Sequence, residues 1–149
     1  MKKMFLFGFV FIVVSTLHAQ TSAIENGGQF RVMGIREVIS TNMFITPGEN
    51  MRFVAFDILI DNSNGENDIR LGGSSRSIEI RDAEGFSYTP NLMSSTLAEP
   101  AMALNTIIEA GDFIRGWITV AIRNEATING LRIRLRANTG QSGWVVIQQ

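Results

Sequence analysis

Short runs in which apolar and polar residues alternate recur from residue 30 to the end of the chain, and turn-forming Gly, Pro and Asn residues separate them. Alternation with a period of two is typical of a β-strand that buries one face. The mature part shows no convincing helical spacing. About seven to nine short strands with frequent turns predict a two-sheet sandwich or a barrel.

The expected strands cover residues 30–39, 51–60, 69–71, 77–81, 86–89, 106–109, 113–122, 131–137 and 144–147. Gly34 is expected at a bulge, and Gly85 in the turn of a hairpin. The predicted core consists of the apolar residues on one face of the alternating strands, namely Phe56, Ile58, Ile118, Val120, Ile133 and Leu135. Residues 20–149 are therefore predicted to form one all-β domain, an immunoglobulin-like, two-sheet antiparallel β-sandwich.

Residues 1–19 have the pattern of a secretory signal peptide. Lys2 and Lys3 precede an apolar run at residues 4–14, and Ala19 is a small residue suited to the position before cleavage. The alternative is an uncleaved anchor, but the run is shorter than the ~20 residues that span a bilayer. No cysteine follows it, so a lipoprotein anchor is excluded. We expect a periplasmic or secreted protein with no membrane span after cleavage.

The residue types that remain after residue 19 restrict the available chemistry. The chain has 13 Lys and Arg against 14 Asp and Glu, so its charge does not favour nucleic acid as a partner. Its two lysines and single histidine, His18, lie within the predicted signal peptide, and it has no cysteine. Catalytic triads, thiolate nucleophiles, Schiff bases and ordinary zinc or copper sites are thereby excluded. We predict a protein that is not an enzyme and uses no cofactor.

Paired carboxylates remain as a possible catalytic group. Asp57 and Asp61 share one face of a predicted strand, but four residues separate them by roughly 13 Å, beyond the ~5–9.5 Å that glycoside hydrolysis uses. Glu79, Asp82 and Glu84 belong to the predicted hairpin and its tip. They are expected to be solvated.

The polar loop from Asp61 to Asp68 invites comparison with a calcium site. An EF-hand loop needs Gly at its sixth position and Glu at its twelfth, whereas here Gly65 is fifth and Gly72 is twelfth. A plain polar loop is the favoured interpretation. We therefore predict that no metal stabilises the fold.

Three arginines form the main candidate binding site. Arg132, Arg134 and Arg136 alternate with apolar residues, so their side chains emerge on one face of a strand at ~6.6 Å intervals. We call these three residues the arginine ridge. It could bind an anionic partner, such as a lipid headgroup, a polysaccharide or an acidic protein. The alternative is an outward face whose arginines pair with acidic residues on neighbouring strands.

Apolar residues in two predicted loops are the second candidate. One group is Met43, Phe44 and Ile45, and the other is Leu92, Met93, Leu97, Met102 and Leu104. Loops at the ends of a sandwich often carry binding residues. The alternative is that they fold back and cap the core.

Three segments at residues 47–62, 80–88 and 110–118 resemble, in their order and spacing, a bacterial cell-envelope family of exported domains of unknown function. That family shares an immunoglobulin-like fold with a secreted immunoprotective antigen of mycobacteria. The resemblance covers roughly residues 28–137 and implies export and a sandwich fold, and it supplies no catalytic residues. Many members begin with a lipoprotein cysteine, which this chain lacks.

The sequence thus predicts an exported, non-enzymatic β-sandwich binding module of the cell envelope or extracellular space. Its partner would be a protein or an anionic envelope component, bound by Arg132, Arg134 and Arg136. The alternative is a structural envelope protein, or a subunit of a larger assembly, that pairs through its edge strands. The oligomeric state stays open.

Overall fold

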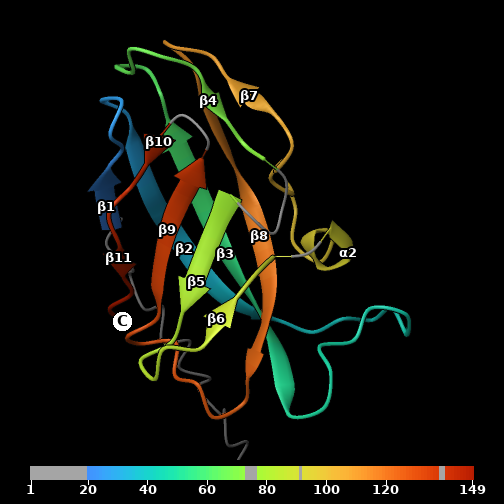
Figure 1. The fold of residues 1–149 in the computed structure, drawn as a ribbon. Helices are drawn as coiled ribbons and strands as arrows, with labels where there is room; N and C mark the ends of the chain where they lie inside the picture. Colours follow the sequence, from blue (N-terminus) through green and yellow to red (C-terminus); the bar gives the residue numbers. More distant parts are fainter. Residues whose placement is uncertain (1–19, 73–76, 91, 138–139) are drawn as a thin grey trace, which may run out of the picture.

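The computed structural model of the protein describes residues 20–72, 77–90, 92–137 and 140–149. The predicted signal peptide lies outside these residues. Within them the regular secondary structure is strand, apart from one helix of a single turn (Figure 1). In chain order the elements are β1 (Gln20–Ala23), β2 (Gln29–Val38), β3 (Met51–Asp61), β4 (Ile69–Arg70), β5 (Ile78–Arg81), β6 (Ser87–Tyr88), α2 (Leu92–Ser95), β7 (Ile107–Ile108), β8 (Phe113–Arg123), β9 (Arg132–Ala137), β10 (Gly140–Gln141) and β11 (Val145–Val146).

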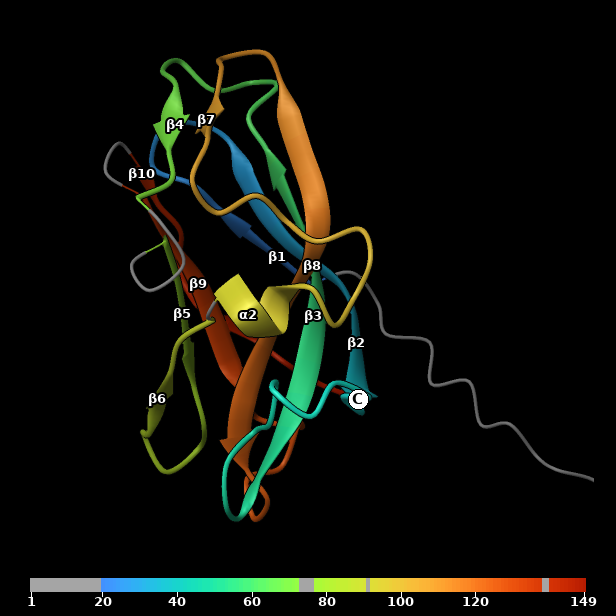
Figure 2. The same ribbon diagram turned by 90° about the vertical axis from the view of Figure 1, so that its right-hand side faces the viewer.

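Two antiparallel sheets pack face to face. The first has the strand order β1-β2-β3-β8, and the second has the order β10-β9-β5-β6, with β11 also paired to β9. Figure 2 shows the two layers from the side, and the short β4–β7 pair lies at one end of the sandwich. The predicted all-β, two-sheet antiparallel sandwich is confirmed.

The core lies between the two sheets and follows the alternation of the sequence. All six predicted core residues are fully buried, so that prediction is confirmed. The strand β3 is also buried on its other face, at Phe53, Ala55 and Asp57. The register of β2 against β3 shifts between Val32 and Gly34, which confirms the predicted bulge.

The predicted long loop at residues 90–104 contains two features that the alternation does not reveal. The helix α2 lies beside β8, where the Ser94 hydroxyl donates a hydrogen bond to the Thr119 carbonyl at 2.9 Å. Ala101 then forms an isolated parallel bridge with Trp117 at the edge of β8. Beyond the bridge, Met102 and Leu104 are buried in the core, so this part of the loop caps the sandwich.

Two short strands, β1 and β10, were not predicted from the sequence. Neither has the apolar alternation of the longer strands, because each contributes few core side chains. A bridge between Ile24 and Ser142 joins the two sheets on this side of the sandwich. The outer edge of the first sheet is therefore partly covered.

The hairpin between β5 and β6 turns at Gly85, whose φ of 91° is the left-handed conformation that glycine favours. Asp82, expected to be solvated, is instead buried. It accepts hydrogen bonds from the Tyr88 hydroxyl at 2.6 Å and from the Arg123 guanidinium at 2.8 Å. The prediction was wrong for Asp82 because β8 brings Arg123 over the turn, whereas Glu84 is exposed as expected.

Among the described residues, no helix is long and apolar enough to cross a membrane.

Candidate functional site

The arginine ridge lies on the outer face of the second sheet. Ile133 and Leu135, which alternate with the three arginines along β9, are fully buried in the core. The three arginine side chains therefore point away from the core. Arg132 and Arg134 are half-buried, and Arg136 is exposed. The predicted common face is therefore present.

Glu79 lies on β5 directly opposite Arg134. Its Oε2 accepts hydrogen bonds from Nε and Nη2 of Arg134 at 2.9 and 2.7 Å, and it lies 3.4 Å from Nη1 of Arg136. Its Oε1 accepts a hydrogen bond from Nε of Arg81 at 2.7 Å. Only 7% of Glu79 is exposed, so the expectation that it is solvated was wrong. The strand pairing places this carboxylate among three guanidinium groups.

The pKa of Glu79 reflects this surrounding. Burial raises the pKa of its carboxyl, but the hydrogen bonds and charges of Arg134 and Arg81 lower it more. The pKa is therefore held below its ordinary value. Glu79 is ionised at neutral pH and neutralises part of the charge of the ridge.

Arg81 and Arg132 are directly opposite one another across the β5–β9 pair. Like charges in this position are destabilising. Within the described part of the chain, no carboxylate lies within ion-pair distance of Arg132, and the one carboxylate that contacts Arg81 is Glu79. This face therefore carries an excess of positive charge.

Trp144 adds an aromatic ring to the same face. Val145 pairs with Ile133, which places Trp144 beside Arg134 at the next position. The guanidinium carbon of Arg134 lies 4.4 Å from the ring centroid, and those of Arg81 and Arg132 lie 5.4 and 5.6 Å from it. These are cation–π distances. We refer below to the arginine face, which consists of Glu79, Arg81, Arg132, Arg134, Arg136 and Trp144.

Sequence reasoning found three of these residues and missed the other three. Glu79 and Arg81 lie more than 50 positions before the ridge, and no local pattern indicates that β5 pairs with β9. Trp144 was expected at the start of a final short strand, but its neighbour in the sheet was not predictable from spacing alone. The polar side of the predicted strand at residues 77–81 was the available signal for Glu79 and Arg81.

The chemistry of the arginine face suits binding of anions. Guanidinium groups form paired hydrogen bonds to carboxylates and phosphates, and they stack on aromatic rings. Among the described residues of this face there are four guanidinium groups and one carboxylate, and the carboxylate contacts three of the four. The face thus presents fixed donors and uncompensated positive charge.

Asp57 and Asp61, the two carboxylates considered as a catalytic pair, each accept hydrogen bonds from other side chains. Asp57, on the outer face of the first sheet, accepts hydrogen bonds from Nε and Nη2 of Arg115 at 3.1 and 2.6 Å. Asp61 accepts hydrogen bonds from the backbone N–H and the hydroxyl of Ser63. Within residues 20–72, 77–90, 92–137 and 140–149, no group of three or more His, Cys, Asp or Glu side chains could hold a metal ion.

The loop after β3 is held by a buried asparagine. The amide of Asn62 donates hydrogen bonds to the carbonyls of Ile108 and Glu109 at 3.1 and 3.0 Å, and its Oδ1 accepts one from Asn26 at 2.9 Å. These bonds fix the loop to the end of β7 and to the residue that follows it. The polar side chains of Asn62 and Asn26 thus link loops of the sandwich.

Comparisons with known proteins give the chain no family. No family model matches it, and no curated protein matches it. Among solved structures, it is similar to a conserved hypothetical protein from Bacillus anthracis, with 11% identity and a TM-score of 0.49 over 88% of this chain and 99% of the other. The resemblance to the exported envelope family stays a prediction.

Proposed function

We propose that this protein is an exported, non-enzymatic immunoglobulin-like binding module that holds an anionic component of the cell envelope on its arginine face. The observation that carries the proposal is the opposition of Arg81 and Arg132. Two like charges in directly opposite positions destabilise a sheet unless something relieves them. An anion bound between them provides that relief.

The alternative within the sequence analysis was an arginine ridge that only pairs with acidic neighbours. Glu79 fulfils that role for Arg134 and, at 3.4 Å, for Arg136. It does not reach Arg132 within ion-pair distance. Pairing with an acidic neighbour therefore applies to Arg134 and Arg136. Arg132 keeps an uncompensated positive charge that is available to an anionic ligand.

The competing function was a structural subunit that pairs through its edge strands. The edge of β8 is occupied at Trp117, whose backbone N–H donates to the Pro100 carbonyl at 2.8 Å and whose carbonyl accepts from the Met102 N–H at 2.9 Å. Ile24, the residue directly after β1, is bridged to Ser142. Covered edges protect a sheet from pairing with another chain. This observation favours the binding module.

The test uses retention on an immobilised acidic polysaccharide, with a salt gradient. Arg132→Gln is expected to weaken retention by about tenfold, because a hydrogen bond to a charged group contributes ~1.5–3 kcal/mol. The matched control is Arg36→Gln. Arg36 also stacks on a tryptophan, with its guanidinium 4.4 Å from the centroid of Trp117, but it lies on the first sheet.

Binding should also fall as salt rises, since exposed charges are screened beyond ~8 Å at physiological ionic strength. Retention that Arg132→Gln leaves unchanged, or that Arg36→Gln weakens equally, would contradict the proposal. Affinity capture from the cell envelope with the same two variants then identifies the natural component.

A further inference from the structure

The strand register gives the arginine face an internal order. Ser87 of β6 lies directly opposite Arg81 of β5. Arg81 in turn lies opposite Arg132 of β9, which is itself opposite Val146 of β11. Side chains that pair across neighbouring strands point to the same side of a sheet. One row across four strands therefore runs from a hydroxyl, through two guanidinium groups, to an apolar side chain. We call these four residues the cationic row.

Arg132 is the member of the row whose donors are open. Among the described residues its guanidinium makes no hydrogen bond and no ion pair, and the guanidinium carbon lies 5.6 Å from the ring centroid of Trp144. An arginine side chain has five N–H donors, and here all of them are available to a ligand. Contact with Trp144 restrains the side chain before a ligand arrives, which lowers the entropy cost of binding.

Arg81 adds donors from the neighbouring strand. Its Nε donates to Oε1 of Glu79 at 2.7 Å, and its Nη2 lies 2.5 Å from the same oxygen. Its Nη1 makes no hydrogen bond within the part of the chain that the structure describes, and 40% of the side chain is exposed. Directly opposite residues have Cα atoms about 4.5–5.5 Å apart. The guanidinium groups of Arg81 and Arg132 can therefore contact one small anion together.

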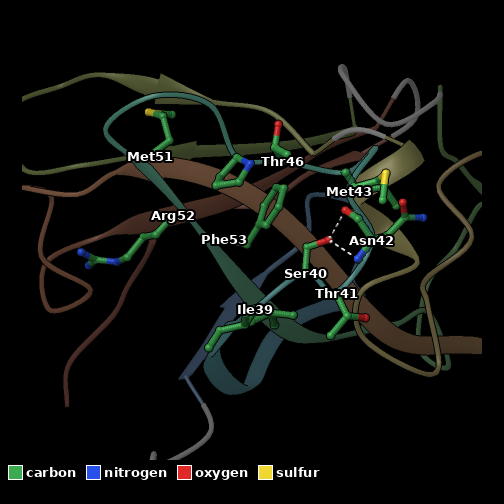
Figure 3. A pocket seen from close by; sticks show the side chains of 12 residues that line it. Ile39, Ser40, Thr41, Asn42, Met43, Thr46, Met51, Arg52 and Phe53 are labelled. Atoms are coloured by element: carbon green, nitrogen blue, oxygen red, sulfur yellow. Dashed lines mark hydrogen bonds between the residues drawn. The ribbon is translucent and has the colours of Figure 1, made fainter.

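Arg52 offers a contrast, because it lines a pocket of about 400 Å³ between residues 38–47 and β3 (Figure 3). Its Nη1 and Nη2 donate to the carbonyls of Asn124 and Ala126 at 2.6 and 2.8 Å. Its Nε lies 3.0 Å from a carboxylate oxygen of Glu37. The donors of Arg52 are thus used within the protein, whereas those of Arg132 are not.

Glu79 shows how a carboxylate engages this face. One of its oxygens accepts two hydrogen bonds from Arg134, and the other accepts from Arg81. Two oxygens and a single charge leave Arg132 without a partner. A phosphate monoester has three terminal oxygens and a charge of about −1.5 to −2 at neutral pH. It can accept hydrogen bonds from two guanidinium groups and a hydroxyl at once, and its charge matches two arginines.

We propose that the cationic row binds the dianionic phosphate of a phosphate monoester between Arg81 and Arg132, with the Ser87 hydroxyl as a third donor. This inference rests on the proposed function, because it names the anion that the arginine face holds. Val146 closes the row at β11 and offers no hydrogen bond, so the phosphate lies toward β6. A sugar phosphate and a phosphate headgroup of a lipid carry the same group.

The test compares three ligands built on one sugar ring, with affinities measured by isothermal titration calorimetry on the exported protein. The ligands are glucose 6-phosphate, glucose 6-sulfate and glucuronate. At about pH 7.5, glucose 6-phosphate is expected to bind at least about tenfold more tightly than the other two, because it alone is a dianion. Flotation with vesicles that contain phosphatidic acid distinguishes a lipid from a sugar as the source, and both sources agree with the proposal.

The pH dependence reports the charge of the ligand. The second pKa of a phosphate monoester is about 6, so about a tenth is dianionic at about pH 5 and the affinity for glucose 6-phosphate should fall about tenfold. The affinity for glucose 6-sulfate should stay constant. The ionisable side chains that face the row from β5 and β9 do not titrate in this range, since the pKa of Glu79 lies below its ordinary value and the others are arginines. These side chains are Glu79, Arg81, Arg132, Arg134 and Arg136. The strands β6 and β11 contribute Ser87, Trp144 and Val146, which also do not titrate there.

Two variants locate the phosphate. Arg132→Gln should weaken binding of glucose 6-phosphate by about tenfold, and Ser87→Ala by about threefold. Ser87 is exposed, so its replacement should leave the free energy of unfolding unchanged. The matched control is Arg36→Gln on the first sheet, which should bind glucose 6-phosphate as the wild type does.

Equal affinity for glucose 6-phosphate and glucuronate would overturn the proposal, and so would an affinity for glucose 6-phosphate that is the same at both pH values. Unchanged binding in Arg132→Gln would also overturn it. The proposed function fails separately, when the acidic polysaccharide does not retain the protein through Arg132. Retention by the polysaccharide without a preference for phosphate would leave the proposed function in place and remove only this inference.

Discussion

Glu79 and Arg134 face each other across the β5–β9 pair, and the carboxylate accepts two hydrogen bonds from the guanidinium at 2.7 and 2.9 Å. This pair has two consequences. It joins one arginine of the ridge to the neighbouring strand, and it buries a carboxylate among groups of opposite charge. Stability and anion binding therefore depend on Glu79 in opposite directions.

Replacing Glu79 with Gln should destabilise the fold and strengthen anion binding. The variant removes the one carboxylate that neutralises the arginine face, so unfolding should become easier by about 1–3 kcal/mol. Retention on the acidic polysaccharide should rise at the same time. Chemical unfolding and salt elution measure the two effects. Glu109→Gln, at an exposed position, is the control.

A loss of both stability and retention in Glu79→Gln would indicate that the carboxylate positions the arginines for the ligand. An unchanged stability would contradict the buried ion pair.

Truncation of the core at Ile118 to Ala should cost ~2–5 kcal/mol in the free energy of unfolding, through lost burial and the resulting cavity. Ile118 is fully buried in β8, on the inner face of the first sheet. The control is Ile107→Ala, because Ile107 is 49% exposed and should lose under about 1 kcal/mol. Equal losses at the two sites would show that the inner face has been misassigned.

Acid should destabilise the protein through Asp82, Glu79 and Asp61, whose pKa values all lie below the ordinary value. Burial raises the pKa of Asp82, but the hydrogen bonds from Tyr88, Arg123 and the Phe86 N–H lower it more, so its pKa lies below the ordinary value. The folded state then binds fewer protons than the unfolded state. The stabilisation is complete above the unfolded pKa, at about pH 4, and is lost as pH falls through the folded pKa.

Between about pH 5 and pH 9, the free energy of unfolding should be nearly constant. The chain's single histidine, His18, lies in the predicted signal peptide, and no other side chain type present titrates ordinarily in that range. Urea unfolding across the range measures this. In Asp82→Asn the acid-induced loss should be smaller, and a variant as acid-sensitive as the wild type would contradict the assignment.

The exported protein should begin near Gln20. The charged start, the short apolar run and Ala19 predict cleavage at this point. Intact-mass measurement of protein recovered after export tests it, and a mass that retains Lys2 and Lys3 would contradict it.

Much of the architecture follows from residue order alone. A strand directs successive side chains to opposite faces, so Ile133 and Leu135 must face away from Arg134 wherever the strand lies. The same rule predicted the core positions Phe56 and Ile118, and the turn at Gly85 followed from local conformational freedom. These are properties of neighbours along the chain.

Only the tertiary structure decided which strands lie side by side, and with them the composition of the arginine face. Glu79, Arg81 and Trp144 reach the ridge through the pairing of β5 and β11 with β9. The burial of Asp82 likewise depends on Arg123, 41 residues later. Pairing is chosen by the packing of the whole core, because many strands share the same alternation and local spacing does not distinguish among partners.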